Sequence, residues 1–247
     1  MDAVITPYGV PLAGGGLQCL ATFVDRPNRF VAVVELPDGT VTKAHIADRG
    51  RLVETLIPGV PICLVARDGA KRATQWQAAA AQRSDGTWAS LDTLLPNRLM
   101  KLLLTEHALP GVPSYTAVRS EVTVGASRFD FALQTDAGPI FLEVKSAGRI
   151  VAEVGLVPDA PSTRATRHLH ELAEHATHGR TCVLVVVAQG SVTRVAIDAT
   201  IDPWLAEAVV AARTAGVLVI GVSAHFDRNG LYFQHTVPCD IYRPDIP

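Results

Sequence analysis

The chain has 247 residues, and 48% of them are hydrophobic, which is enough to bury the core of one large or two modest domains. Its formal net charge is −2 and its pI is about 6.4, so no global basic field marks a tight, non-specific binder of nucleic acid. The four cysteines lack C-x-x-C spacing, the first basic residue is Arg26, and no apolar run approaches membrane-spanning length. We therefore expect a folded cytoplasmic protein without a structural zinc, a signal peptide or a membrane span.

The first part of the chain consists of short β-rich segments separated by turns. Strands are expected at residues 30–36, 41–46, 60–66 and 76–82, with Asp38-Gly39 as a hairpin turn. Closely spaced strands of this kind predict a small β-barrel, most simply of the oligonucleotide- or oligosaccharide-binding (OB) type. We assign residues 1–92 to this OB-like domain and interpret residues 1–22 as a partly flexible lead-in.

The pattern changes after Leu94. Pro96 begins a predicted helix that runs to about His107, and Asp202 with Pro203 begins another that runs to Ala215. The remaining elements are strands at 118–124, 128–133, 140–145, 181–188 and 217–222, and a helix at 163–178. Helix, three antiparallel strands, helix, strand, helix and strand describe a mixed sheet flanked by helices, of class α+β or α/β. This second domain is expected to cover residues 93–247.

The turn at residues 135–139 folds two strands of the second domain against each other, and this places two carboxylates together. With the turn centred near Ala137, Asp130 lies opposite Val144 within one residue, and so beside Glu143. Lys145 shares the face of Glu143 because side chains alternate along a strand. Two facing carboxylates are destabilising unless a cation compensates them, and Lys145 is such a cation.

Two interpretations of this cluster stay open. Carboxylates with a free coordination position suit Mg²⁺ or Mn²⁺, which can activate water and stabilise charge on a phosphate oxygen. Asp130, Glu143 and Lys145 are then catalytic residues, Asp130 and Glu143 are metal ligands, and Glu121 on the neighbouring strand is a candidate third carboxylate. The alternative is an exposed hairpin whose Glu143 and Lys145 form a surface pair that contributes little. Glu121 is equally open to interpretation as an exposed strand residue.

The helix at 163–178 carries polar residues at helical spacing on the side opposite its apolar face. They are Arg164, His168, Glu171 and His175. Basic groups near a helix amino terminus favour phosphate binding, although such a stripe is also common on a solvated face. Metal binding by His168, Glu171 and His175 is a weaker option, because no further ligand is evident.

Several separate motifs occur in the order seen in one known family. They are His45 with Gly50-Arg51, Leu95-Pro96-Asn97-Arg98, Ser127-Arg128-Phe129-Asp130-Phe131, Glu143-Val144-Lys145, Pro158-Asp159-Ala160, and Arg164 with His168-Leu169 and Glu171-Leu172. In this set and order the chain resembles the sugar fermentation stimulation protein (SfsA) family from about Arg26 to Ala224. Many motifs in one order are far more specific than any one of them.

The resemblance implies an OB-type barrel followed by a domain like the PD-(D/E)XK restriction-endonuclease-like nucleases. It also implies nucleic-acid partners, DNA and by extension RNA, and a nuclease dependent on Mg²⁺ or Mn²⁺ that hydrolyses phosphodiester bonds at Asp130, Glu143 and Lys145. The residues expected to contact nucleic acid are Arg128, Arg164, Arg167 and His168 in the second domain, with Arg29, Arg49 and Arg51 in the barrel.

The chain departs from the family pattern in two places. Where the family usually reads Cys-Pro-Asn-Thr-Gly after the barrel histidine, this chain reads Ile46-Ala47-Asp48-Arg49-Gly50, and a glycine and a lysine of the helix motif are Ala165 and Arg167. The alternative function is a DNA-binding regulator of sugar-utilisation genes without catalysis, and a barrel that binds a sugar is a third. The oligomeric state stays open, with a homodimer among the options.

Overall fold

The computed structural model describes residues 8–12, 15, 18–50, 52–53, 55–67, 73–125 and 127–243. The chain divides into two compact units. One comprises Gly9–Leu95 with Phe226–Tyr232, and the other comprises Tyr8, Pro96–His225 and the described residues from Phe233 onward. The barrel unit thus takes in a segment from late in the sequence, whereas the two predicted domains are each continuous in sequence. Among the described residues, no helix has the length and apolarity needed to cross a membrane.

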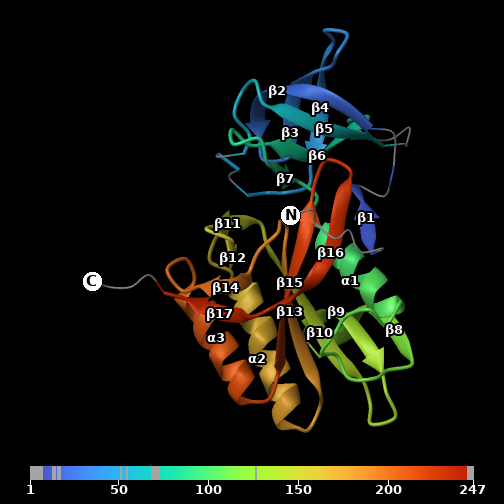
Figure 1. Cartoon of the computed structure of the whole chain (residues 1–247), viewed down its shortest axis with the longest axis vertical. Coiled ribbons are helices and arrows are strands. Elements are labelled where there is room, and N and C mark those ends of the chain that lie inside the picture. The colour runs from blue at the N-terminus through green and yellow to red at the C-terminus, as the bar shows by residue number, and fades with distance from the viewer. Residues whose placement is uncertain are drawn as a thin grey trace. The chain divides into compact units, whose positions relative to one another are not determined.

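The first unit is built on a closed barrel (Figure 1). Its strands are β2 (Gln18–Asn28), β3 (Val31–Glu35), β4 (Val41–Ile46), β5 (Pro61–Ala66) and β6 (Trp76–Gln82), with β7 (Trp88–Ser90) added beside β6. The order β4-β3-β2-β5-β6 closes through parallel pairing of β4 with β6. Alternate residues such as Phe23, Val34 and Leu64 point inward and form the core. The predicted OB-type barrel is confirmed.

Two strands occupy part of residues 1–22, the segment interpreted from the sequence as a partly flexible lead-in. Strand β2 begins at Gln18 and runs through Asn28, and β1 (Gly9–Pro11) precedes it. Phe23, at 2% exposure, is the main core residue of β2. Register shifts between Phe23 and Asn28 break the regular alternation along this strand. These irregularities are one reason why its period of two is hard to recognise in the sequence.

The second unit contains most of a seven-stranded mixed sheet of order β1-β16-β15-β13-β10-β9-β8. Its strands in chain order are β8 (Ala117–Val124), β9 (Ser127–Gln134), β10 (Ile140–Ala147), β13 (Cys182–Ala188), β15 (Leu218–Phe226) and β16 (Gly230–Val237). Strands β8, β9 and β10 pair antiparallel, whereas β10, β13 and β15 run parallel. For the three helices and the strands of this sheet, the predicted order is confirmed from α1 to β15, but β16 was not anticipated.

A second, four-stranded sheet was also not predicted. Its order is β11-β12-β14-β17, formed by β11 (Arg149–Val151), β12 (Val154–Val157), β14 (Arg194–Asp198) and β17 (Cys239–Tyr242). These strands have only three to five residues each, so they offer too few alternations for a periodic signal. The loop that follows β12 forms one wall of the site described below.

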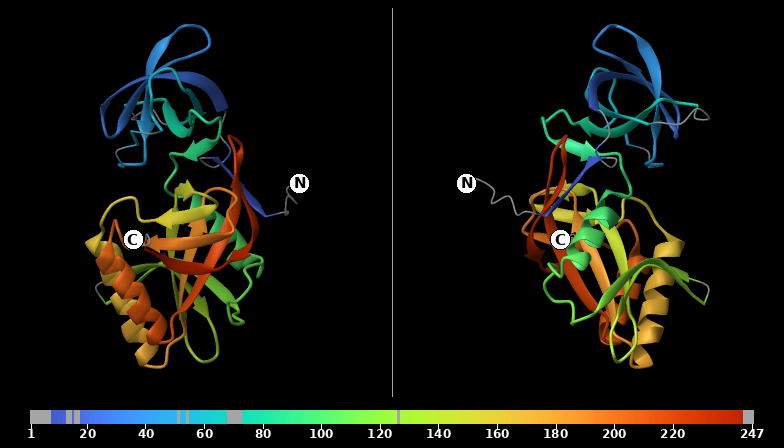
Figure 2. Two further views of the ribbon diagram at one scale, coloured as in Figure 1. Left: turned by 60° about the vertical axis from the view of Figure 1, so that its left-hand side comes forward. Right: turned by 90° about the vertical axis from the view of Figure 1, so that its right-hand side faces the viewer.

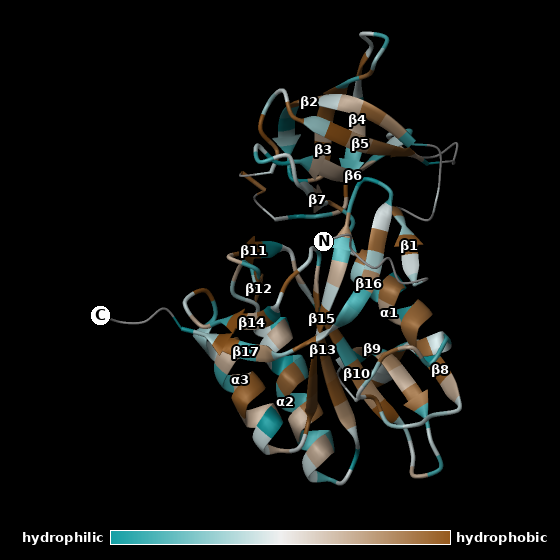
Figure 3. Cartoon of the chain, in the orientation of Figure 1, coloured by the Kyte–Doolittle hydropathy of each residue, from teal (hydrophilic) through white to brown (hydrophobic). Residues whose placement is uncertain are grey.

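Helices cover both faces of the large sheet. Helices α2 (Thr163–Thr177) and α3 (Pro203–Thr214) lie side by side on one face, and α1 (Leu95–Thr105) lies on the other (Figure 2). Strand β13 is buried along its whole length and is hydrophobic throughout (Figure 3). Its Leu184 and Val186 belong to the same core as α2 and α3, while the alternate residues point to the opposite face.

One buried carboxylate, that of Asp202, accepts hydrogen bonds at the amino ends of both α2 and α3. Asp202, 2% exposed, accepts through Oδ1 from Leu205 N at 3.0 Å, which caps α3 as predicted. Its Oδ2 accepts from Ser162 N at 2.8 Å, and Ser162 in turn caps α2 by accepting from Ala165 N at 3.2 Å. The two helix starts are thereby fixed to each other, which positions the α2 residues that face the sheet.

We predict that Asp202→Ala lowers the free energy of unfolding by about 2 kcal/mol, because it removes one cap and leaves a second, partly buried N–H without its acceptor. Asp202→Asn keeps one acceptor and should lose less. Ser162→Ala, which removes a single cap, should lose about 1 kcal/mol. Urea unfolding of the three variants measures the series, and equal losses for Asp202→Ala and Ser162→Ala would contradict the bridging role.

Candidate active site

The candidate site forms where β9 and β10 separate. Their ladder pairs Ile140 with Leu133, Phe141 with Ala132 and Leu142 with Phe131, and the regular pairing ends there. The next positions along this register are Asp130 and Glu143, in agreement with the register predicted from the turn to within one residue. Val144 N donates instead to the side chain of Asp130, at 2.8 Å from Oδ2. The carboxylate of Asp130 thus takes the place of a backbone partner at the point where the strands diverge.

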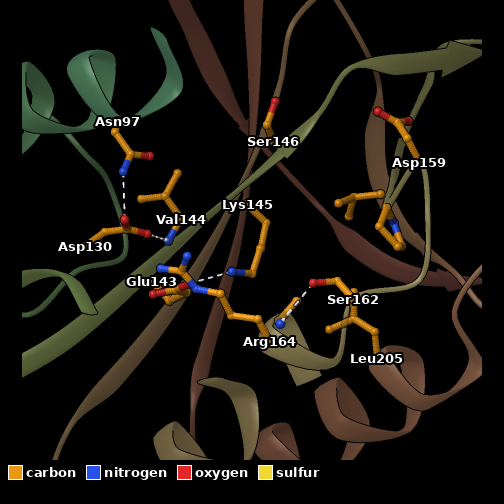
Figure 4. A pocket seen from close by; sticks show the side chains of 13 residues that line it. Asn97, Asp130, Glu143, Val144, Lys145, Ser146, Asp159, Ser162, Arg164 and Leu205 are labelled. Atoms are coloured by element: carbon orange, nitrogen blue, oxygen red, sulfur yellow. Dashed lines mark hydrogen bonds and ion pairs between the residues drawn. The ribbon is translucent and has the colours of Figure 1, made fainter. Parts of the chain in front are cut away.

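A cavity of about 330 Å³ opens beside this point (Figure 4). Its lining joins β9 and β10 to the loop after β12 and to the first turns of the helices. The lining residues are Asn97, Asp130, Glu143, Val144, Lys145, Ser146, Val157, Pro158, Asp159, Ser162, Arg164, Ala165 and Leu205. The structure therefore brings together Asp130, Glu143, Lys145 and Arg164, four residues that the sequence analysis selected.

Asp130 is held from the side of α1. Asn97, in the first turn of α1, donates through Nδ2 to Asp130 Oδ1 at 2.7 Å, while Val144 N binds Oδ2. Burial raises the pKa of Asp130, and the charge of Glu143 raises it further. The hydrogen bonds from Val144 N and Asn97 and the charge of Lys145 oppose this rise without cancelling it. The two carboxylates are therefore close enough to repel each other.

Glu143 is held from the opposite side, by α2 and by its own strand. It is 3% exposed, and its Oε1 lies 2.5 Å from Lys145 Nζ and 2.7 Å from His168 Nδ1. Its second oxygen, Oε2, is buried and has no hydrogen-bond partner among the described residues. A buried carboxylate oxygen without a donor is costly, and a bound cation is one of the groups that would satisfy it.

The structure corrects the predicted place of Glu121. Its backbone lies between Ser120 and Val122, which face Phe131 and Phe129, so it is near Asp130 as expected. Its φ of +55°, however, breaks the regular strand geometry. The exposed carboxylate lies 3.8 Å from Arg128 Nη2 and is not part of the cavity lining. Glu121 is therefore not a third carboxylate of the site, and Arg128 is an exposed residue outside it.

The sequence also predicted that Arg164, His168, Glu171 and His175 lie together on the side of α2 opposite its apolar face, and this is wrong for His168. His168 is 3% exposed and points to Glu143, so it does not face solvent as a phosphate contact would. His175 packs its ring against Phe129 and Phe141. Arg164 is exposed and lines the cavity, while Arg167 is exposed and lies 3.9 Å from Glu171. The solvent-facing side of α2 is instead formed by Thr163, Arg164, Arg167, His170, Glu174 and Thr177.

Metal ligands from side chains are few. Among the described residues, no group of three or more His, Cys, Asp and Glu side chains is arranged to hold a metal ion. This speaks against a histidine-rich metal site on α2 and leaves Asp130 and Glu143 as the acidic pair. The loop residue Asp159 lines the same cavity but lies apart from this pair (Figure 4).

Several residues of the site had no assigned role in the sequence analysis. Asn97, Ser146, Asp159 and Ser162 line the cavity, and only the first and third occur in the motifs quoted for the family resemblance. Nothing in the local sequence indicates that Asn97 reaches Asp130, because the two residues are 33 positions apart. The place of Asn97 in the Leu95-Pro96-Asn97-Arg98 motif of the family resemblance was the available signal.

Comparison with known proteins identifies the family. Residues 94–230 match the sugar fermentation stimulation protein RE domain, and residues 24–91 match the SfsA N-terminal OB domain. A sugar fermentation stimulation protein homolog of Chloroflexus aurantiacus is 37% identical over 94% of this chain and 90% of its own length. The chain belongs to the SfsA family.

Other members of the SfsA family extend this result. A homolog of Desulforamulus reducens is 34% identical over 90% of this chain and 92% of its own length. The structure of Pyrococcus furiosus SfsA in complex with Ca²⁺ superposes with a TM-score of 0.81 at 28% identity, covering 94% of this chain and 100% of that one. The SfsA fold thus extends over nearly all of this chain, as the family resemblance implied.

The raised pKa of Asp130 gives a prediction for the metal-free protein. Ionised Asp130 costs stability above its folded-state pKa, and this cost disappears when the residue is protonated at lower pH. Asp130→Asn should therefore raise the free energy of unfolding by about 0.5–2 kcal/mol at pH 7. The gain should shrink as the pH falls toward 3.8, the ordinary Asp value. Thermal unfolding in EDTA from pH 7 to pH 3 measures it, and a loss of stability at pH 7 would contradict the repulsion.

Proposed function

We propose that this SfsA-family chain binds nucleic acid and hydrolyses phosphodiester bonds, using a divalent cation held by Asp130 and Glu143. The observation that carries the proposal is Glu143 Oε2, a buried oxygen without a hydrogen-bond partner among the described residues, beside Asp130, whose pKa is raised by burial and then by the charge of Glu143. The complex of Pyrococcus furiosus SfsA with Ca²⁺ supports cation binding in a relative of the same fold. Ca²⁺, Mg²⁺ and Mn²⁺ all prefer oxygen ligands, which is the donor set found here.

The residues present suit Mg²⁺ or Mn²⁺ rather than a metal that needs a full protein cage. Mg²⁺ is commonly bound by one or two carboxylates, with waters and substrate phosphates completing its shell. Asp130 and Glu143 would supply those carboxylates, and a bound phosphodiester would supply the remaining oxygen ligands. When bound, the cation would supply Lewis acidity toward a phosphate oxygen and an activated water.

Lys145 and Arg164 are the cationic side chains of the cavity. Lys145 is 18% exposed and pairs with Glu143, so its ammonium is held at the carboxylates but still reaches the cavity. There it would orient the attacking water or stabilise charge that develops on the phosphate. Arg164 extends from the first turn of α2 along the cavity (Figure 4) and would bind a neighbouring phosphate as a bidentate donor.

The barrel offers a second surface with the chemistry of nucleic-acid binding. Phe30 is 43% exposed in the turn between β2 and β3, and the guanidinium of Arg49 lies 5.2 Å from its ring centroid. Arg26 donates to three backbone carbonyls, those of Gly50, Arg29 and Asp48, and so fixes this turn to the loop that follows β4. We propose that Phe30 stacks on a base while Arg29 and Arg49 contact phosphates. Arg51 lies outside the described residues.

The alternative function is a nucleic-acid-binding regulator that does not cut. One observation favours this alternative: Lys145 and His168 already give Glu143 two hydrogen-bond donors without a metal. A structural ion pair of this kind would persist in a protein that has lost catalysis. Cleavage and metal dependence distinguish the two functions.

We predict that the purified protein cuts labelled single-stranded DNA, double-stranded DNA or RNA in Mg²⁺ or Mn²⁺ and not in EDTA. Asp130→Asn should reduce the rate by more than the ~10–100-fold that loss of an outer-shell partner costs, because it removes a metal ligand. Glu121→Gln is the matched control on the adjacent strand and should cut at the wild-type rate. Binding that survives in EDTA, together with no cleavage in any metal, would favour the regulator.

We predict separately that Phe30→Ala weakens binding of a single-stranded oligonucleotide by about 1–3 kcal/mol, the usual contribution of one base–aromatic stack. Fluorescence anisotropy in the Asp130→Asn background measures binding without cutting. Val41→Ala, which shortens another exposed apolar side chain of the barrel, is the control and should leave the affinity unchanged. Equal affinities for Phe30→Ala and the parent would exclude the barrel turn as a stacking site.

A further inference from the structure

His168 is the one buried side chain of α2 that makes a polar contact with the acidic pair in the described structure. Its Nδ1 lies 2.7 Å from Glu143 Oε1, and both residues are 3% exposed. Because an ionised carboxylate only accepts hydrogen bonds, the proton of this contact belongs to His168 Nδ1. The contact is therefore a hydrogen bond from the helix to one chosen oxygen of Glu143.

The imidazole ring of His168 is fixed by its surroundings. It sits on the buried side of α2 with Ala165, Leu169 and Leu172. The rings of Phe129 and His168 pack edge to face, at a centroid distance of 6.3 Å and an interplanar angle of 67°. A ring packed in this way on a long helix has little freedom to leave Glu143.

His168 does not line the cavity, so it cannot contact a substrate there directly. Any effect of His168 on the site must pass through Glu143. Lys145 binds the same oxygen, but it does so through a flexible side chain that reaches the cavity. Lys145 is thus able to turn toward a phosphate, whereas His168 remains on Oε1 when it does.

We propose that His168 is a positioning residue that holds Glu143 by Oε1, so that Oε2 remains the oxygen that binds the divalent cation. This inference rests on the proposed function and assigns His168 a role other than phosphate binding. Groups that orient a metal ligand in this way commonly change metal affinity when they are lost. The free Oε2 is the feature that such a restraint would produce.

The test compares variants that differ in where they place a donor. His168→Leu removes the hydrogen bond but keeps apolar bulk, and His168→Asn places an amide N–H near the position of Nδ1. His168→Gln places its amide closer to the position of Nε2 and so offers a polar variant without the correct donor. His175→Leu is the matched control, because His175 lies on the same helix and packs on the same Phe129 without touching Glu143.

Isothermal titration of each full-length variant with Mn²⁺ should show His168→Leu and His168→Gln binding about 10–100-fold more weakly than wild type. His168→Asn should bind within a few-fold of wild type, and His175→Leu should bind as wild type. Thermal unfolding in EDTA reports any general loss of stability. If His168→Leu does not fold, the Asn and Gln pair decides the result.

Three outcomes would overturn the inference alone. They are wild-type Mn²⁺ affinity in His168→Leu and His168→Gln, equal weakening in His168→Asn and His168→Gln, and equal weakening in His175→Leu. Wild-type protein that binds no Mn²⁺, or binds it as tightly as Asp130→Asn does, would overturn the proposed function and the inference together. The two failures are therefore distinguishable.

Discussion

Burial of the Glu143 carboxylate is the constraint on which the site depends. A carboxylate that is 3% exposed must be neutralised or hydrogen-bonded, and the fold supplies an ammonium from β10 and an imidazole from α2. Both donors bind one oxygen, so the second oxygen keeps its full capacity to accept. The acidic pair is thus held by two different helices, with Asn97 of α1 on Asp130 and His168 of α2 on Glu143. Placing helices on both faces of the sheet is what makes this possible.

Short stretches of sequence were enough to predict much of this arrangement. The alternation in residues 128–133 and the β-rich run at 140–145, joined by a compact turn, predict the hairpin and hence the proximity of Asp130, Glu143 and Lys145. Barrel strands with clear alternation, such as β3 and β4, were predicted within a residue or two of their observed ends. Local periodicity succeeds for β3 and β4 because buried and more exposed residues alternate along them, whereas β10 is buried on both faces and was predicted from its β-rich composition.

The residues that the sequence placed wrongly or missed have identifiable structural causes. His168 was placed on the exposed face because histidine is polar, yet 165, 168, 169 and 172 follow the spacing of a buried helical face. Glu121 has the expected register, but its φ is positive and its exposed carboxylate lies near Arg128, outside the cavity lining. Asn97 joins the site through a contact between distant parts of the chain, which no window of sequence contains. Tertiary partners, backbone irregularities and very short strands are therefore the parts that pattern reasoning did not recover.

The hydrogen bonds of Asp202 restrict how one wall of the cavity can move. The side of the cavity formed by Ser162, Ala165 and Leu205 comes from two helices that share a single acidic anchor at their amino ends. Sliding of α3 relative to α2 would break a hydrogen bond of Asp202, so the amino ends of the two helices are restrained to move together. The wall of the cavity formed by these two helix starts is therefore expected to keep its shape when the cavity is occupied.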